Sequence, residues 1–301
     1  MGSNIRKGSV LVICATVCWG LISPLAKIIS AADIDLMTLM VFRSLFTIAV
    51  SLLCLFLVGN PARLRVDRET LCFYFLCGFF SIALAGGCYL KSLSYLTVAQ
   101  ALVIHYTSPL VTLAGSMWIT REKPTLLHAA AGVIIVAGVF AGMGGSLTAF
   151  SSVSAAGVIW AALSVIGLSG QTLVGRRFSI SHETDRFAML LYSSISGCIL
   201  LFAYKTIFTG WADVRLITPR IFSLMCFVGF TGSFLAYGLF YASLKYIPAA
   251  AVNLFSTFEI VVAVGLTALL VGQIPSGHEI LGCALIMTAI FCAYIATEKK
   301  K

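Results

Sequence analysis

Ten apolar segments, each about as long as a membrane-spanning helix, follow one another along nearly the whole chain. A helix needs about 20 predominantly apolar residues to cross a bilayer, and it satisfies its own backbone hydrogen bonds there. Short polar or Gly- and Pro-containing breaks separate the segments. The pattern therefore predicts an all-α polytopic membrane protein. Its ten expected transmembrane helices lie at 8–30, 36–59, 70–90, 97–120, 125–146, 152–174, 187–208, 219–243, 248–271 and 277–296.

The composition excludes a water-soluble fold. Apolar residues make up 60% of the 301 residues, charged residues make up 10%, and the mean hydropathy is +1.03. Soluble domains average about 25% charged residues, and a single core could not bury this many apolar side chains. The net charge of +9 comes from basic residues scattered singly along the chain, so no nucleic-acid partner is expected. The expected partner is the lipid bilayer.

The distribution of basic residues predicts the orientation in the membrane. If the N-terminus is cytoplasmic, 14 of the 20 Lys and Arg residues fall on the cytoplasmic side and four on the other side. Basic residues favour the cytoplasmic side of a membrane protein. We therefore expect a multi-pass protein with both termini in the cytoplasm.

An internal repeat relates the two halves of the chain. A shift of 151 residues places 78–124 over 229–275 without a gap, and 11 of the 47 aligned positions are identical. The matches cluster in Gly, Ala, Pro and a Ser-Leu-x-Tyr turn. Because each copy holds five spans, the second copy enters the membrane from the opposite face. The sequence thus predicts two inverted five-helix repeats, 1–147 and 148–301, an arrangement common among transporters.

Polar residues interrupt the middle of two symmetry-related segments. Glu259 lies near the centre of the ninth segment with Asn253 and Thr257, and His105 and Tyr106 lie near the centre of the fourth. A charged residue in the middle of a span costs about 2.5–3.5 kcal/mol on insertion scales, so it indicates a cavity or a partner. These residues predict a polar binding site at the midplane.

Two interpretations of these polar residues stay open at this level. In one, Glu259 and His105 line a site and bind substrate or take up a proton. In the other, they belong to a structural network, in which Glu259 pairs with Arg43 or Lys27 and His105 bonds a backbone carbonyl.

Several short motifs resemble the EamA type of the drug/metabolite transporter superfamily. They are the Ser-Leu-x-Tyr turns at 92–95 and 243–246, Pro109, and the turn 121–124 (Arg-Glu-Lys-Pro) followed by Gly132. The chain departs from the family pattern at two positions. Gln273 stands where the second repeat would have an acidic residue, and Ile260 replaces an expected proline, which predicts a straighter ninth helix.

The resemblance implies that the first, third, fourth, sixth, eighth and ninth helices line a central cavity. It adds polar and aromatic candidates from the first, sixth and eighth segments to the midplane residues, although Trp and Tyr in membranes also serve as interfacial anchors. The predicted substrate-binding residues are Trp19, Ser23, His105, Tyr106, Trp160, Gln171, Tyr237, Tyr241, Asn253, Thr257 and Glu259.

The predicted function is a secondary active transporter in the inner membrane that works by alternating access. The resemblance implies amino acids and related small organic metabolites as substrates, with export as the direction. If Glu259 is unpaired, a mildly acidic cavity with aromatic walls favours zwitterionic or cationic compounds. Protons are a further candidate partner. No cofactor or metal is expected, and motifs for ATP binding or hydrolytic catalysis are absent from the sequence. The alternative is a non-transporting scaffold or an intramembrane enzyme that uses His105 and Glu259.

A G-x-x-x-G pattern at Gly138 and Gly142 favours close helix packing. It fits either a dimer interface or packing against the tenth segment within one chain. The sequence leaves the oligomeric state open.

Overall fold

The computed structural model describes residues 2–57, 61–145, 153–182 and 185–299, and all regular structure within these ranges is helical. The boundary expected between 147 and 148 lies outside the described residues. The first half contains α1 (Gly2–Gly20), α2 (Ile22–Ser30), α3 (Leu36–Leu57), η1 (Pro61–Leu64), α4 (Arg68–Gly78), η2 (Phe79–Cys88), α5 (Tyr89–Ser92), α6 (Val98–His105), α7 (Ser108–Gly115), η3 (Ser116–Thr120) and α8 (Leu126–Gly142). The second half contains α9 (Ala155–Ser181), α10 (Arg186–Phe208), η5 (Ala212–Leu216), α11 (Pro219–Gly229), η6 (Phe230–Leu235), α12 (Ala236–Ser243), α13 (Ala249–Ser256), α14 (Phe258–Val271) and α15 (Gly277–Glu298).

The ten expected spans are present as helical segments. Within the described residues, nine continuous or jointed helices are long and apolar enough to cross a membrane. The remaining span is α8, which is apolar and has 17 residues. The prediction of an all-α polytopic membrane protein is confirmed.

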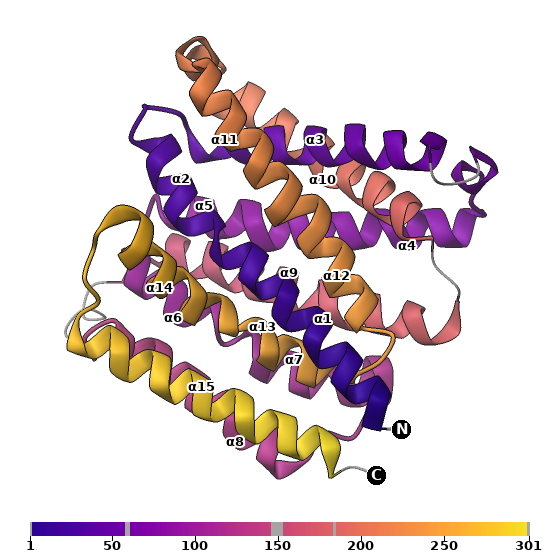
Figure 1. The fold of residues 1–301 in the computed structure, drawn as a ribbon, viewed down its shortest axis with the longest axis vertical. Coiled ribbons are helices and arrows are strands. Elements are labelled where there is room, and N and C mark those ends of the chain that lie inside the picture. Colours follow the sequence, from indigo (N-terminus) through magenta and orange to yellow (C-terminus); the bar gives the residue numbers. More distant parts are fainter. Residues whose placement is uncertain (1, 58–60, 146–152, 183–184, 300–301) are drawn as a thin grey trace.

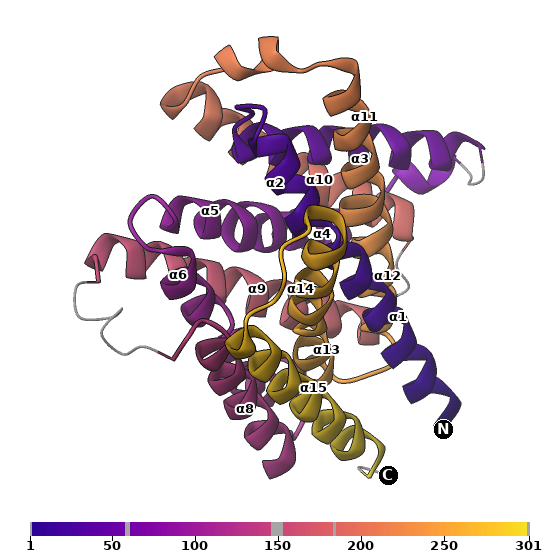
Figure 2. The ribbon, with the colours of Figure 1, turned by 60° about the vertical axis from the view of Figure 1, so that its left-hand side comes forward.

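The two halves interlock because the first helix of each half packs against helices of the other half. The α1 helix packs against α12, α13 and α14 of the second half, while α9 packs against η2, α5, α6 and α7 of the first half. The second spans of the two halves, α3 and α10, pack against each other, and so do the fifth spans, α8 and α15. Figure 1 shows α8 and α15 side by side, and Figure 2 shows α9 lying among the helices of the first half.

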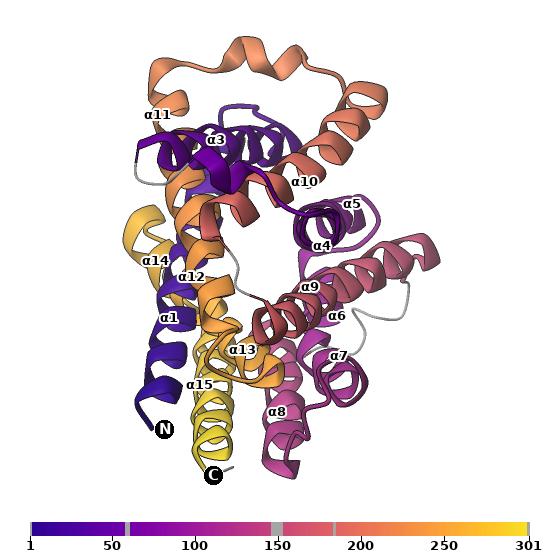
Figure 3. The same cartoon turned by 90° about the vertical axis from the view of Figure 1, so that its right-hand side faces the viewer.

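The beginning of α1 and the end of α15 lie at the same end of the molecule (Figures 1 and 3). We call this end the terminal face and the other end the opposite face. Each span crosses between them, so the turn from η3 to α8 and the turn from α12 to α13 both lie on the terminal face. The turn between α14 and α15 lies on the opposite face.

The fourth and ninth spans are each broken in the middle. The fourth span is interrupted at Tyr106 and Thr107, between α6 and α7, and the ninth at Thr257, between α13 and α14. These interruptions coincide under the 151-residue shift. The expectation of a straighter ninth helix, which rested on Ile260 in place of proline, is wrong. The hydroxyl of Thr257 donates to the carbonyl of Leu254 at 2.7 Å, and such local bonds bend helices without proline.

Glycines allow α8 and α15 to approach closely. A Cβ atom added at Gly282 would lie 2.6 Å from the carbonyl oxygen of Gly138 and 2.7 Å from the Cα of Gly142. Gly138 and Gly142 thus pack against the tenth span within the chain, as one of the two sequence interpretations proposed.

We expect Gly282→Ala to destabilise the protein, because its methyl group would meet backbone atoms that cannot rotate away. Overpacking of this kind costs about 1–3 kcal/mol. Gly265→Ala in α14 is the matched control, since a Cβ atom there meets nothing within 4 Å. Thermal unfolding in detergent should show a lower Tm for Gly282→Ala only. Equal Tm values for the two variants would contradict the close packing of α8 and α15.

Candidate functional site

A cavity of about 680 Å³ lies between the two halves. Its inner part is lined by the broken fourth and ninth spans, together with α1, η2, α9 and α12. Its lining continues to the helix ends at the opposite face, where Leu36, Val98 and Glu279 border it. The cavity therefore runs from the middle of the spans toward the opposite face.

The structure brings nine of the eleven predicted site residues into this one cavity. They come from five spans, the first, fourth, sixth, eighth and ninth. The nine are Trp19, Ser23, His105, Tyr106, Gln171, Tyr237, Asn253, Thr257 and Glu259.

Two predicted site residues, Trp160 and Tyr241, lie outside the lining of this cavity. Trp160 is near the opposite-face end of α9, where the helix packs against the turn after α5, with Leu96 in contact with Gly157. Tyr241 is one helical turn closer to the terminal face than Tyr237. It is buried there among aromatic rings and borders a second, smaller cavity.

Arg43 belongs to the cavity lining but was not among the predicted site residues. It is 9% exposed and does not extend to the membrane surface. Its Nε donates to Ser233 Oγ at 2.9 Å and its Nη2 donates to the carbonyl of Gly232 at 3.0 Å. A guanidinium has five N–H donors, so further donors remain for a ligand. A mid-span position of an always-charged residue was the signal that could have identified it.

Tyr89 is a second lining residue that sequence reasoning missed. It follows Ser81 and Ala85 at intervals of four residues, and all three line the cavity. This spacing places them on one face of the third span and was the available signal. The Tyr89 ring lies 4.9 Å from the ring of His105.

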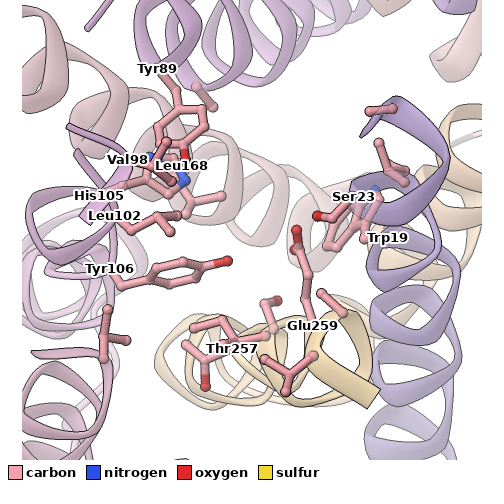
Figure 4. Close-up of a pocket in the computed structure, with 18 of the residues that line it drawn as sticks. Trp19, Ser23, Tyr89, Val98, Leu102, His105, Tyr106, Leu168, Thr257 and Glu259 are labelled. Carbon is pink, nitrogen blue, oxygen red and sulfur yellow. The ribbon is translucent and has the colours of Figure 1, made fainter. Parts of the chain in front are cut away.

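The break at Thr257 places Glu259 in the first turn of a new helix, α14. The N-terminus of a helix carries partial positive charge and favours a carboxylate. Figure 4 shows the carboxylate pointing into the cavity, between Tyr106 on one side and Ser23 and Trp19 on the other. Helix geometry therefore aims this carboxylate at the cavity.

Neither cation that could neutralise Glu259 forms an ion pair with it. None of the ion pairs among the described residues contains Glu259 or Arg43. Lys27 instead donates from Nζ to Gln273 Oε1 at 2.9 Å. The structural-network interpretation of Glu259 thus finds no support in these contacts.

His105 is bonded to a side chain rather than to a backbone carbonyl. Its Nδ1 lies 2.8 Å from Ser164 Oγ, and that hydroxyl donates its own hydrogen to the carbonyl of Ala161 at 2.7 Å. The hydroxyl must therefore accept from Nδ1–H. In the neutral ring, Nε2 is then the hydrogen-bond acceptor.

Aromatic rings cover one wall of the cavity. Trp19 contacts Tyr237 edge-on, with centroids 5.3 Å apart, and also contacts Phe240 at 5.2 Å. On the opposite wall the Tyr106 ring extends toward Glu259 (Figure 4). Aromatic faces of this kind contact apolar groups and attract cations.

A polar network, which we call the terminal-face latch, closes the structure between the cavity and the terminal face. Glu122 Oε1 accepts from Arg176 Nε at 2.8 Å, and Glu122 Oε2 accepts from the backbone N–H of Ala249 at 3.0 Å. Arg176 also donates from Nη1 to the carbonyl of Leu244. Glu122 belongs to the first half, whereas Arg176, Leu244 and Ala249 belong to the second, so the latch ties the halves together.

A weaker contact occupies the related position on the opposite face. Under the 151-residue shift Gln273 corresponds to Glu122, and Lys27 lies two residues from the counterpart of Arg176. The Lys27–Gln273 hydrogen bond is exposed to solvent and pairs a charge with a neutral amide. The two faces of the protein are therefore held by contacts of different strength.

Comparisons with known proteins give a matching family model, a similar transporter and a structural neighbour. The model of the EamA-like transporter family matches residues 6–142 and again residues 155–295. The chain is similar to the uncharacterized transporter YxxF of Bacillus subtilis (strain 168), with 22% identity over 226 residues that cover 74% of this chain and 70% of the relative. A protein of known crystal structure shares the fold, with a TM-score of 0.78, 17% identity and coverage of 98% of both chains.

We expect Arg176→Gln to destabilise the protein by about 1–3 kcal/mol, because it leaves the mostly buried Glu122 carboxylate without its charged partner. Both side chains of this pair are 14% exposed. Arg63→Gln is the control, since Arg63 forms an ion pair with Asp185 but is 55% exposed, and surface pairs contribute about 0–1 kcal/mol. Chemical denaturation in detergent would measure the free energy of unfolding of both variants. If Arg176→Gln lowers this free energy no more than Arg63→Gln does, the latch does not hold the halves together.

Proposed function

Because this chain belongs to the EamA-like transporter family and is a multi-pass membrane transporter, we propose that it is a secondary active transporter of zwitterionic metabolites, with amino acids as the substrate class. One observation carries the proposal: Arg43 and Glu259 line the same cavity and do not form an ion pair with each other. Two opposite charges that share a cavity without direct contact favour a ligand that carries both charges itself.

The remaining lining suits such a ligand. The carboxylate of Glu259 would bind the substrate ammonium group, and the free donors of Arg43 would bind its carboxylate. The Gln171 side chain is 1% exposed, and its Oε1 has no hydrogen-bond partner among the described residues, so it offers a further acceptor. Trp19 and Tyr237 would contact the substrate side chain. The cavity volume of about 680 Å³ lies within the usual range for small-molecule sites.

We propose that transport follows alternating access in the inner membrane. In the present conformation the cavity lining reaches the opposite face, while the latch holds the terminal face together. Opening of the terminal face would require Glu122 and Arg176 to separate. With both termini cytoplasmic, as the distribution of basic residues predicts, the cavity in this conformation faces away from the cytoplasm. An exported substrate would leave the protein from this conformation.

The alternative functions find less support. An enzyme that used His105 and Glu259 as an acid–base pair would need the two groups within reach of a shared reacting atom. His105 bonds Ser164, and among the described residues no hydrogen bond joins it to Glu259. A scaffold would not need an unpaired arginine and an unpaired glutamate in one cavity.

We expect Glu259→Gln and Arg43→Gln to impair recognition of different substrate groups. Counterflow of a labelled amino acid in proteoliposomes would be competed with the corresponding amine and with the corresponding carboxylic acid. Loss of a charge-assisted hydrogen bond costs about 1.5–3 kcal/mol, or about tenfold to hundredfold in affinity. Glu259→Gln should weaken competition by the amine, and Arg43→Gln competition by the acid.

Glu279→Gln is the matched control for this experiment. It removes a carboxylate from the mouth of the cavity, and glutamine retains the capping interaction with Ser276 at the start of α15. Counterflow by this variant should equal wild type. Equal loss of amine and acid competition in both cavity variants would contradict the zwitterion model, and no counterflow of any amino acid by wild type would contradict the substrate class.

We expect Gln273→Glu to stabilise the present conformation, in which the contact with Lys27 is already formed, because it converts that hydrogen bond into an ion pair. Exposed ion pairs contribute about 0.2–1 kcal/mol, so the ratio of protein open to the opposite face to protein closed there should rise by up to about fivefold. Cys283 lines the cavity and is a native reporter of its accessibility. Its rate of modification by a hydrophilic maleimide, followed by peptide mass spectrometry, should rise for Gln273→Glu and fall for Gln273→Leu. An identical rate in all three proteins would rule out a gating role for this contact.

A further inference from the structure

A second cavity, of about 230 Å³, lies on the terminal face, away from the central cavity. It is bordered by the end of α9, the beginning of α10 and the end of α12. Its outer lining is polar and basic and includes Ser179, Arg186 and Lys245, while its inner lining includes Met189 and Leu190. The cavity thus combines a cationic rim with an apolar floor.

The side chain of Tyr246 at this rim is surrounded by the positive charges of Lys7, Lys245 and Arg186. The Lys7 ammonium lies over the ring of Tyr246, 4.8 Å from its centroid, and Tyr246 borders the cavity. Tyr246 lies in the turn between α12 and α13, outside the spans. The pKa of its hydroxyl is lowered, chiefly by a hydrogen bond with Lys7, against the opposing effect of partial burial, and also by the charges of Lys7, Lys245 and Arg186. The lowered pKa indicates a positive electrostatic potential at this rim.

Among the described residues, the two carboxylates beside this rim, Asp185 and Glu69, form no ion pair with these cations. Asp185 precedes Arg186 in the chain but forms an ion pair with Arg63 at 2.9 Å. Glu69 lies 4.0 Å from Nε2 of His182, another lining residue, and its side chain is 78% exposed. None of the ion pairs among the described residues contains Lys7, Arg186 or Lys245.

We propose that this terminal-face cavity binds a phosphate-bearing anion, supplied either by the headgroup of an anionic phospholipid or by a soluble phosphate. Arginine binds phosphate oxygens through paired N–H groups, and lysine adds a point charge. The apolar floor formed by Met189 and Leu190 suits the carbon atoms of a headgroup. The rim lies where the spans end, at the depth of lipid headgroups. The site is separate from the central cavity and does not depend on the proposed transport of zwitterions.

The test measures binding to the purified full-length protein and to the double variant Arg186→Gln/Lys245→Gln. The first probe is fluorescent phosphatidylglycerol in nanodiscs of phosphatidylcholine, and the second is inorganic phosphate followed by calorimetry. Each basic residue near an anionic membrane surface contributes about 1 kcal/mol, so the double variant should lose about thirtyfold in affinity. If the double variant loses affinity for phosphatidylglycerol alone, the source of the anion is lipid. If it loses affinity for both probes, the cavity is a general phosphate site.

Three further variants separate a specific site from general surface charge. Arg68→Gln removes an exposed cation from the same face but outside the rim and should bind as wild type does. The exchange Arg186→Lys/Lys245→Arg preserves both charges and should retain binding. Glu259→Gln in the central cavity should leave binding unchanged. The proposal is overturned if wild type binds neither probe, if Arg68→Gln loses as much affinity as the double variant, or if Glu259→Gln alone abolishes binding.

Discussion

The backbone breaks in the fourth and ninth spans are the constraint on which the rest of the site depends. Inside a bilayer, non-helical backbone is tolerated only where protein or a water-filled cavity covers it. The breaks at Tyr106 and at Thr257 face one shared cavity, so each break is compatible with the membrane because the other half surrounds it. The same breaks end α6 at His105 and begin α14 just before Glu259, and thereby aim both side chains at the cavity.

The exchange of first helices between the halves makes this arrangement mechanically coupled. Because α9 of the second half packs on the third and fourth spans of the first, and α1 packs on the eighth and ninth spans of the second, movement of either half acts directly on helices of the other. In the proposed alternating access, the contacts that bridge the halves at the two faces would determine the balance between conformations. An ion pair with 14% exposed partners holds the terminal face, and an exposed charge–amide bond holds the opposite face. In that proposal, glutamine rather than an acidic residue at position 273 would bias the protein between its conformations.

Much of the fold could be predicted because hydrophobic length and a repeat carry the information directly. The ten spans follow from the apolar segments, and the central cavity residues follow from polar groups that a membrane excludes, such as Glu259 and His105. The two site residues that lie outside the central cavity were misplaced because their positions depend on the rotation of a helix and on depth along it rather than on residue type. Tyr241 lies only one turn from Tyr237, yet that turn places it below the cavity, and Trp160 lies where α9 packs against Leu96.

Arg43 and Thr257 show a second limit of sequence reasoning. The side chain of a basic residue inside a span can either extend to the membrane surface or stay buried. Only the carbonyl of Gly232 and the hydroxyl of Ser233, on a different span, make the buried position of Arg43 stable. The break at Thr257 likewise depends on a threonine hydroxyl bonding a carbonyl three residues earlier, a local choice that many threonines in helices do not make. Tertiary contacts select the buried position of Arg43, and a local hydrogen bond selects the break at Thr257, each from several conformations that the sequence allows. Together these two selections place an arginine and a glutamate in one cavity.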